Sequence, residues 1–158
     1  MLTRKLLCAL LVSLLALPLF AQSEQYGTPI NADLAKKAAA AAIAEARKNN
    51  FAMAIAIVDP NGFLVYFEKM DNTQNGSVNI ALDKARSAAL FKRPTKAFQD
   101  ALAAGGEGLR LLGLQGAVPV DGGLPIIVAG KVVGAIGASG GTSTQDGQVA
   151  KAGVDAAK

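Results

Sequence analysis

The sequence contains no histidine among its 158 residues. Histidine is the commonest general base in enzymes and a frequent nitrogen ligand of zinc, copper and haem iron. Its absence excludes a Ser-His-Asp hydrolase and every metal site built on imidazole. Residues 137–141 match the G-x-S-x-G pattern of hydrolases, but no base is present to take the proton of Ser139. A tight turn between a strand and a helix explains this segment instead.

Cysteine is nearly absent as well, because Cys8 is the single one in the sequence. It lies in an N-terminal stretch with a basic start, an apolar run from residue 6 to residue 17, and Ala21 as a small residue suited to cleavage. The run is shorter than the roughly 20 residues that a membrane-spanning helix needs. The pattern predicts a signal peptide over residues 1–21, with no membrane span after its removal. The mature protein is then expected to be periplasmic or secreted, without a thiol or a disulfide.

A block of basic residues is also missing. The formal net charge is +4 at pH 7, and removal of Arg4 and Lys5 with the signal peptide lowers it to +2. So mild a basicity gives no reason to expect nucleic-acid binding. Residues 22–158 have the length of one domain with a single core. We therefore expect one domain after the signal peptide.

Apolar spacing and turn residues predict the secondary structure of this domain. Residues 51–58 are apolar at every position, which is typical of a strand buried on both faces. The turn formers at residues 59–62 return the chain as a hairpin with residues 63–70. Similar patterns predict a helix from Asn31 or Asp33 to Asn50 and further helices at residues 77–91, 95–104 and 144–157. Residues 107–115 are predicted to form a strand or a loop. Two more strands are predicted on either side of a turn at residues 129–131. This order favours an α+β domain in which an antiparallel sheet carries helices on both faces.

Glycine is concentrated late in the chain, where 13 of the 17 glycines lie between Gly105 and Gly147. Each costs backbone entropy, so each indicates a positive φ angle or a close approach to the backbone. We interpret the concentration as a binding surface, in which the N–H groups of residues 140–143 can hold a carboxylate or phosphate. Alternatively these groups are capped within the chain. Two capping boxes fit here, Thr142 with Gln145 and Ser143 with Asp146.

Basic residues surround a rigid corner at Pro94, with Lys84 and Arg86 before it and Arg93 and Lys96 beside it. Such a group suits an acidic ligand. Solvated charges at a helix end explain it equally well.

Several short segments follow one another in a distinctive order and spacing: residues 57–62 (IVDPNG), 68–71 (EKMD), Ser77 with 80–81 (IA) and 84–86 (KAR), 93–95 (RPT), 122–126 (GGLPI), 133–142 (VGAIGASGGT), and then Asp146, Ala150 and Gly153. In this arrangement the chain resembles the GlcG/HbpS-like haem-binding family, which includes the C-terminal domain of PduO-type proteins. The resemblance implies a profilin-like three-layer fold, with a five-stranded antiparallel sheet and helices on both faces, and assembly into symmetric homo-oligomers. It also implies haem or another tetrapyrrole as the ligand.

The resemblance and the basic corner together predict a pocket between Lys84, Arg93 and residues 122–125, where cations and backbone N–H groups hold the haem propionates. The candidate ligand-binding residues are Met70, Asp71, Lys84, Arg93, Thr95, Gly122, Gly123, Pro125, Ser139 and Asp146. In a chain without histidine, the candidate donors to the haem iron are Met53, Met70, Tyr66 and Tyr26. Core packing or surface exposure also explains each of these four.

The sequence therefore predicts an exported haem-binding protein that acts as a carrier or as the accessory of a sensor, with a sensor or a transporter as partner and no catalytic cycle of its own. An alternative is a periplasmic enzyme or accessory protein that binds a small organic acid through Lys84, Arg93 and Asp146. A third hypothesis is a scaffold or signalling partner without any ligand.

Overall fold

The computed structural model describes residues 25–158, so the predicted signal peptide at residues 1–21 lies outside the described residues. The elements follow in the order β1 (Gln25–Tyr26), α1 (Ala32–Lys48), β2 (Ala54–Val58), β3 (Leu64–Lys69), α2 (Ser77–Phe91), α3 (Thr95–Ala103), the 3₁₀ helix η1 (Gly106–Gly113), β4 (Gly123–Val128), β5 (Lys131–Ser139) and α4 (Ser143–Ala156). The predicted helices and hairpins are present at the predicted places. Within the described range, no helix combines the length and the apolar character needed to span a bilayer.

The sheet is organised around β5. Ile136 of β5 is paired with Leu124 of β4 on one edge and with Ile57 of β2 on the other. Strand β3 pairs with β2, and β1 pairs with the first two residues of β5. All pairings are antiparallel except that of the two-residue β1, which is parallel. The predicted α+β fold, with five strands and helices on both faces, is confirmed.

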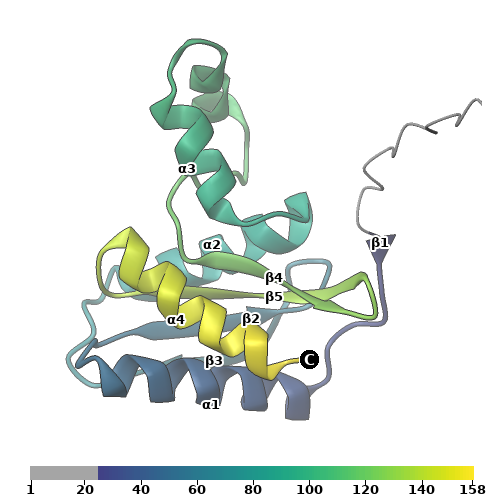
Figure 1. Cartoon of the computed structure of the whole chain (residues 1–158), viewed down its shortest axis with the longest axis vertical. Coiled ribbons are helices and arrows are strands. Elements are labelled where there is room, and N and C mark those ends of the chain that lie inside the picture. Colours follow the sequence, from purple (N-terminus) through teal and green to yellow (C-terminus); the bar gives the residue numbers. More distant parts are fainter. Residues whose placement is uncertain (1–24) are drawn as a thin grey trace, which may run out of the picture.

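Strand β2 is buried on both faces, as its apolar sequence predicts. Ile55 and Ile57 pack into a core with α1 and α4, whereas Ala54 and Ala56 pack against α2 on the opposite face. Alternate side chains of a strand point to opposite faces, so this one segment contributes to both cores. Figure 1 shows α1 and α4 on one side of the sheet and α2 on the other.

The α2 face is packed so closely that glycine is required on the strands. A Cβ atom at Gly137 would lie 2.6 Å from the backbone nitrogen of Ala85, and one at Gly123 would lie 2.6 Å from Cγ2 of Thr95. Both glycines would also meet backbone carbonyl groups of α2. The interpretation of the late glycines as a binding surface is therefore wrong at these two positions, because helix backbone fills the space in front of them.

Helix α3 and η1 form an arm that stands away from the sheet (Figure 1). The prediction of a strand or loop at residues 107–115 is wrong, because Gly106–Gly113 is a 3₁₀ helix with no buried residue. The 3₁₀ helix has three residues per turn. Leucines three apart, Leu109 and Leu112, accordingly share one side, and both are more than half exposed. We call residues 95–114 the α3–η1 arm.

Candidate functional site

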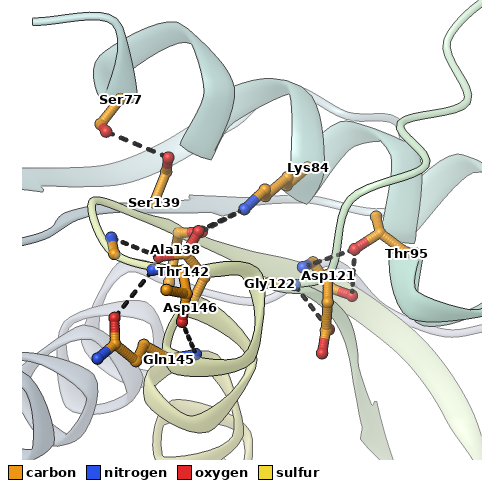
Figure 2. A network of polar contacts seen from close by, with 12 residues as sticks. Ser77, Lys84, Thr95, Asp121, Gly122, Ala138, Ser139, Thr142, Gln145 and Asp146 are labelled. Atoms are coloured by element: carbon orange, nitrogen blue, oxygen red, sulfur yellow. Dashed lines mark hydrogen bonds and ion pairs between the residues drawn. The ribbon is translucent and has the colours of Figure 1, made fainter. Parts of the chain in front are cut away.

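Two regions of the structure gather functional groups, and the first is a buried polar network centred on Lys84 (Figure 2). The Lys84 side chain leaves α2 and is 1% exposed. Its Nζ donates a hydrogen bond to Oδ2 of Asp146 at 2.7 Å and another to the carbonyl oxygen of Ala138 at 3.3 Å. A buried ammonium group needs such partners, since leaving it unpaired away from water is costly. The pair joins α2 to α4 across the end of β5.

Asp146 belongs to the first turn of α4, where the N–H groups of the helix favour a carboxylate. Its Oδ1 accepts a hydrogen bond from the backbone nitrogen of Gly141 at 3.0 Å. Burial raises the pKa of Asp146, while the Lys84 ammonium and the Gly141 N–H act in the opposite direction. Of the two capping boxes that fit the sequence, Thr142 with Gln145 is present. Asp146 does not form the second box, because its carboxylate is bonded to Lys84 and Gly141.

Hydroxyl groups extend the network at both ends (Figure 2). Oγ of Ser139 donates to Oγ of Ser77 at 3.2 Å, which links β5 to the start of α2. Oγ1 of Thr95 accepts from the backbone nitrogen of Gly123 at 2.9 Å and donates to the carbonyl oxygen of the same residue at 3.4 Å. The start of α3 is thereby fixed to β4. Each of these groups already has its hydrogen-bond partner within the chain.

The structure brings together six of the ten predicted ligand-binding residues: Lys84, Thr95, Gly122, Gly123, Ser139 and Asp146. All six are buried. Pro125 is buried in β4, and Met70 and Asp71 follow the end of β3. Arg93 is exposed at the base of the arm and lines a different hollow from that expected. The structure does not bring Lys84 and Arg93 to one pocket, because Lys84 is turned inward to Asp146 and Arg93 lines the hollow of the arm.

The candidate iron donors are dispersed. Met53 is fully buried in the core with α1 and α4, and Met70 packs against the same core. The hydroxyl of Tyr66 donates to Glu68 at 3.0 Å, and this hydrogen bond raises the tyrosine's pKa. The hydroxyl of Tyr26 donates to the carbonyl oxygen of Ala89 at 3.1 Å, and burial raises its pKa. A raised pKa keeps a phenol protonated, so neither tyrosine is prepared as a phenolate ligand.

The second region is a cavity of about 430 Å³ between α3 and η1. We call it the arm cavity. Its lining consists of Phe91, Phe98, Leu111, Gly113 and Leu114, together with the two cations Arg93 and Arg110. A second hollow of about 350 Å³ shares four of these residues and continues along α3. The arm therefore offers an extended apolar surface with two guanidinium groups.

Two aromatic rings that meet at the arm cavity also orient one of its cations. The rings of Phe91 and Phe98 meet edge to face, with centroids 5.3 Å apart. The guanidinium carbon of Arg93 lies 5.7 Å from the Phe98 ring centroid, and its Nε donates to the carbonyl oxygen of Phe91 at 3.2 Å. An arginine that stacks on a ring keeps further N–H groups free for a carboxylate. Arg110 faces Glu107 at 3.9 Å, with both side chains at least 80% exposed.

Sequence reasoning missed five residues of this cavity: Phe91, Phe98, Arg110, Leu111 and Leu114. The spacing of the leucines by three residues was a usable signal, because it matches one side of a 3₁₀ helix. The two phenylalanines gave no such signal. They lie on either side of the corner at Pro94, and no periodicity carries across that corner.

A model of the family described as "Haem degrading protein HbpS-like" matches residues 30–155. The chain belongs to the HbpS-like family. A structure of a double mutant of HbpS from Streptomyces reticuli agrees with this, with 30% identity, a TM-score of 0.75, and coverage of 83% of this chain and 88% of HbpS. Protein GlcG of Escherichia coli K12 is 37% identical over 110 residues, which are 70% of this chain and 81% of GlcG. An uncharacterized 15.0 kDa protein in the dhaT-dhaS intergenic region of Citrobacter freundii is 38% identical over 85% of this chain and 95% of its own length.

Proposed function

We propose that this HbpS-like protein binds haem in the arm cavity. The observation that carries the proposal is the pairing of an apolar cavity of about 430 Å³ with two arginines, Arg93 and Arg110, at its lining. Haem has the complementary chemistry, because its ring is apolar and its two propionates are anionic. The family description supports the same ligand class.

The lining fits the porphyrin part of haem. Aromatic and leucine side chains bury the faces of a flat apolar ligand, with a gain of about 25 cal/mol for each Å² removed from water. Hydrogen bonds from guanidinium to carboxylate are about twice as strong as neutral ones and are often bidentate. Arg93 is exposed but already oriented by Phe98, so binding a propionate costs it less side-chain entropy.

Titration of haem into the purified protein tests the proposal. We expect a Soret band that differs from that of free haem in buffer. Free haem aggregates in buffer, whereas bound haem is a single ring in an apolar site. Substitution of Arg93→Gln together with Arg110→Gln is expected to weaken binding roughly tenfold, or about 1.4 kcal/mol. Arg47→Gln, an exposed arginine of α1, is the matched control. A Soret band identical to that of free haem, or equal loss in the control, contradicts the proposal.

Export, and a role as carrier or sensor accessory, are part of the same proposal. Export is supported by the signal-peptide pattern of residues 1–21. Removal of this segment is checked by the mass of the protein recovered from the periplasm or the medium. A protein that retains the full 16.1 kDa contradicts export with cleavage.

We further propose that the protein forms a homo-oligomer through the arm. Leu109 and Leu112 are 55% and 72% exposed, which is unfavourable for neighbouring leucines in water. A second copy of the chain would cover them. We expect Leu112→Ser to lower the mass measured by light scattering to that of one chain, whereas Leu64→Ser on β3, 51% exposed in the wild type, leaves it unchanged. A single-chain mass for the wild type contradicts this proposal.

The small-acid alternative loses its support at the residues on which it depends. Lys84 and Asp146 are paired with each other and buried. Neither is among the residues that line the arm cavity beside Arg93. A thermal shift with small carboxylates in the absence of haem would restore this alternative.

A further inference from the structure

The arm cavity differs from an ordinary haem pocket in the chemistry of its lining. The only charged or polar side chains among its lining residues are those of Arg93 and Arg110. Guanidinium groups are permanently protonated and present no lone pair to a metal. The remaining lining residues are phenylalanine, leucine and glycine, whose side chains have no donor atom for iron.

The side chains in residues 25–158 that resemble known haem ligands are committed elsewhere. Met53 is enclosed in the core, and Met70 packs against it from the end of β3. The Tyr26 hydroxyl is bonded to the carbonyl oxygens of Ala89 and Leu90 at 3.1 and 3.0 Å. Tyr66 is bonded to Glu68. None of these four candidate donors lines the arm cavity or the hollow beside it.

One carboxylate lies close enough to require a separate control. Glu107 lines the hollow that adjoins the arm cavity, and its Oε2 is 3.9 Å from Nη1 of Arg110. Its side chain is 93% exposed. A carboxylate this exposed and this near a guanidinium group is hydrated and attracted to the cation, which makes it a poor partner for iron.

We infer that the arm cavity recognises the porphyrin ring and its carboxylates and does not recognise the central metal, so that iron-free protoporphyrin binds there as tightly as haem. This inference rests on the proposed function and specifies its ligand class. Ring burial and the arginine contacts are the same for the two ligands. A coordination bond, the one interaction that separates them, has no donor in this lining.

The test compares haem with protoporphyrin IX on the same purified protein. The chain contains no tryptophan, so both titrations are followed by the porphyrin's own absorption, and for protoporphyrin IX by its emission as well. We expect the two dissociation constants to agree within about tenfold. Arg93→Gln with Arg110→Gln should weaken both ligands by the same factor, and Glu107→Gln and Arg47→Gln should weaken neither.

The outcomes separate this inference from the function on which it rests. Tight haem binding with little or no protoporphyrin binding overturns the inference and leaves haem binding intact. Loss of haem affinity alone in Glu107→Gln also overturns it, because that carboxylate would then serve the iron. If both ligands bind equally and the double substitution of Arg93 and Arg110 weakens neither, the binding is adventitious adsorption and the inference is overturned. Failure of both ligands to bind removes the proposed function as well.

Discussion

Two lysine–aspartate pairs in this protein have the same length and opposite surroundings. In the polar network, Lys84 and Asp146 are 2.7 Å apart with side chains 1% and 4% exposed. In the α3–η1 arm, Lys96 and Asp100 are also 2.7 Å apart, but their side chains are 54% and 60% exposed. Water screens the second pair and not the first. The same contact therefore fixes the architecture in one region and is nearly neutral in the other.

The other groups of the two regions differ in the same way. In the network, hydroxyls, carboxylates and backbone groups bond to one another and leave nothing free for a ligand. In the arm, Leu109 and Leu112 face solvent, and Arg93 and Arg110 keep N–H groups beyond their contacts with Phe91, Phe98 and Glu107. A region whose polar groups are hydrogen-bonded within the chain specifies how the helices pack on the sheet. A region with apolar surface exposed to water is where a ligand gains the most free energy by burying that surface.

The largest effect is expected from breaking the buried pair. Asp146→Ala leaves the Lys84 ammonium buried without its carboxylate, so the free energy of unfolding should fall by about 3–5 kcal/mol. Asp100→Ala removes the matched pair in the arm, and its free energy of unfolding should equal that of the wild type within error. Urea denaturation followed by circular dichroism measures both variants. Similar losses in the two would show that exposure does not distinguish these pairs.

Glycines provide the second contrast. Gly137→Ala directs a methyl group against the backbone of α2, and overpacking of this kind costs about 1–3 kcal/mol. Gly113→Ala in the arm has no atom within 4 Å of the new methyl group. We expect the unfolding midpoint to fall in the first variant only. A stable Gly137→Ala protein would mean that α2 can move away from β5 at little cost.

A smaller, pH-dependent effect should accompany Lys84→Met. Burial holds the pKa of Asp146 above its ordinary value in the folded protein, and loss of the ammonium raises it further. A carboxyl group whose pKa is raised in the folded state adds to the free energy of unfolding. This stabilisation is complete below the pKa of the unfolded state and is lost as pH rises through the pKa of the folded state. The free energy of unfolding of Lys84→Met is lower than that of the wild type, and this difference should therefore shrink as pH falls towards about 4. Each unit of pKa difference between the two proteins corresponds to about 1.4 kcal/mol.

Urea denaturation at a series of pH values checks this sign. Lys96→Met, which removes the exposed lysine of the arm, is the control. Its difference from the wild type in free energy of unfolding should not follow the titration of Asp146. A Lys84→Met deficit that stays constant, or that grows in acid, contradicts the assignment of the pH dependence to Asp146.

Local pattern was sufficient for most of the fold. The all-apolar β2, the turn formers that follow it and the capping of α4 by Thr142 each depend on neighbours in the chain, so the sequence predicts them directly. The same holds for Asn31, whose Oδ1 accepts from the backbone nitrogen of Leu34 at 2.9 Å and begins α1. The family resemblance added the number of strands, because pairing between distant segments leaves no local signal.

The sequence by itself determined helices α1 to α4, strands β2 to β5 and the absence of imidazole, since these depend on residue type and short spacing. Tertiary structure decided that Lys84 turns inward to Asp146, 62 residues away in the chain. It also decided that Phe91 and Phe98 meet across a corner to form a cavity. Which polar groups are satisfied and which surface stays open depends on contacts between distant segments, and only the packed chain defines those contacts.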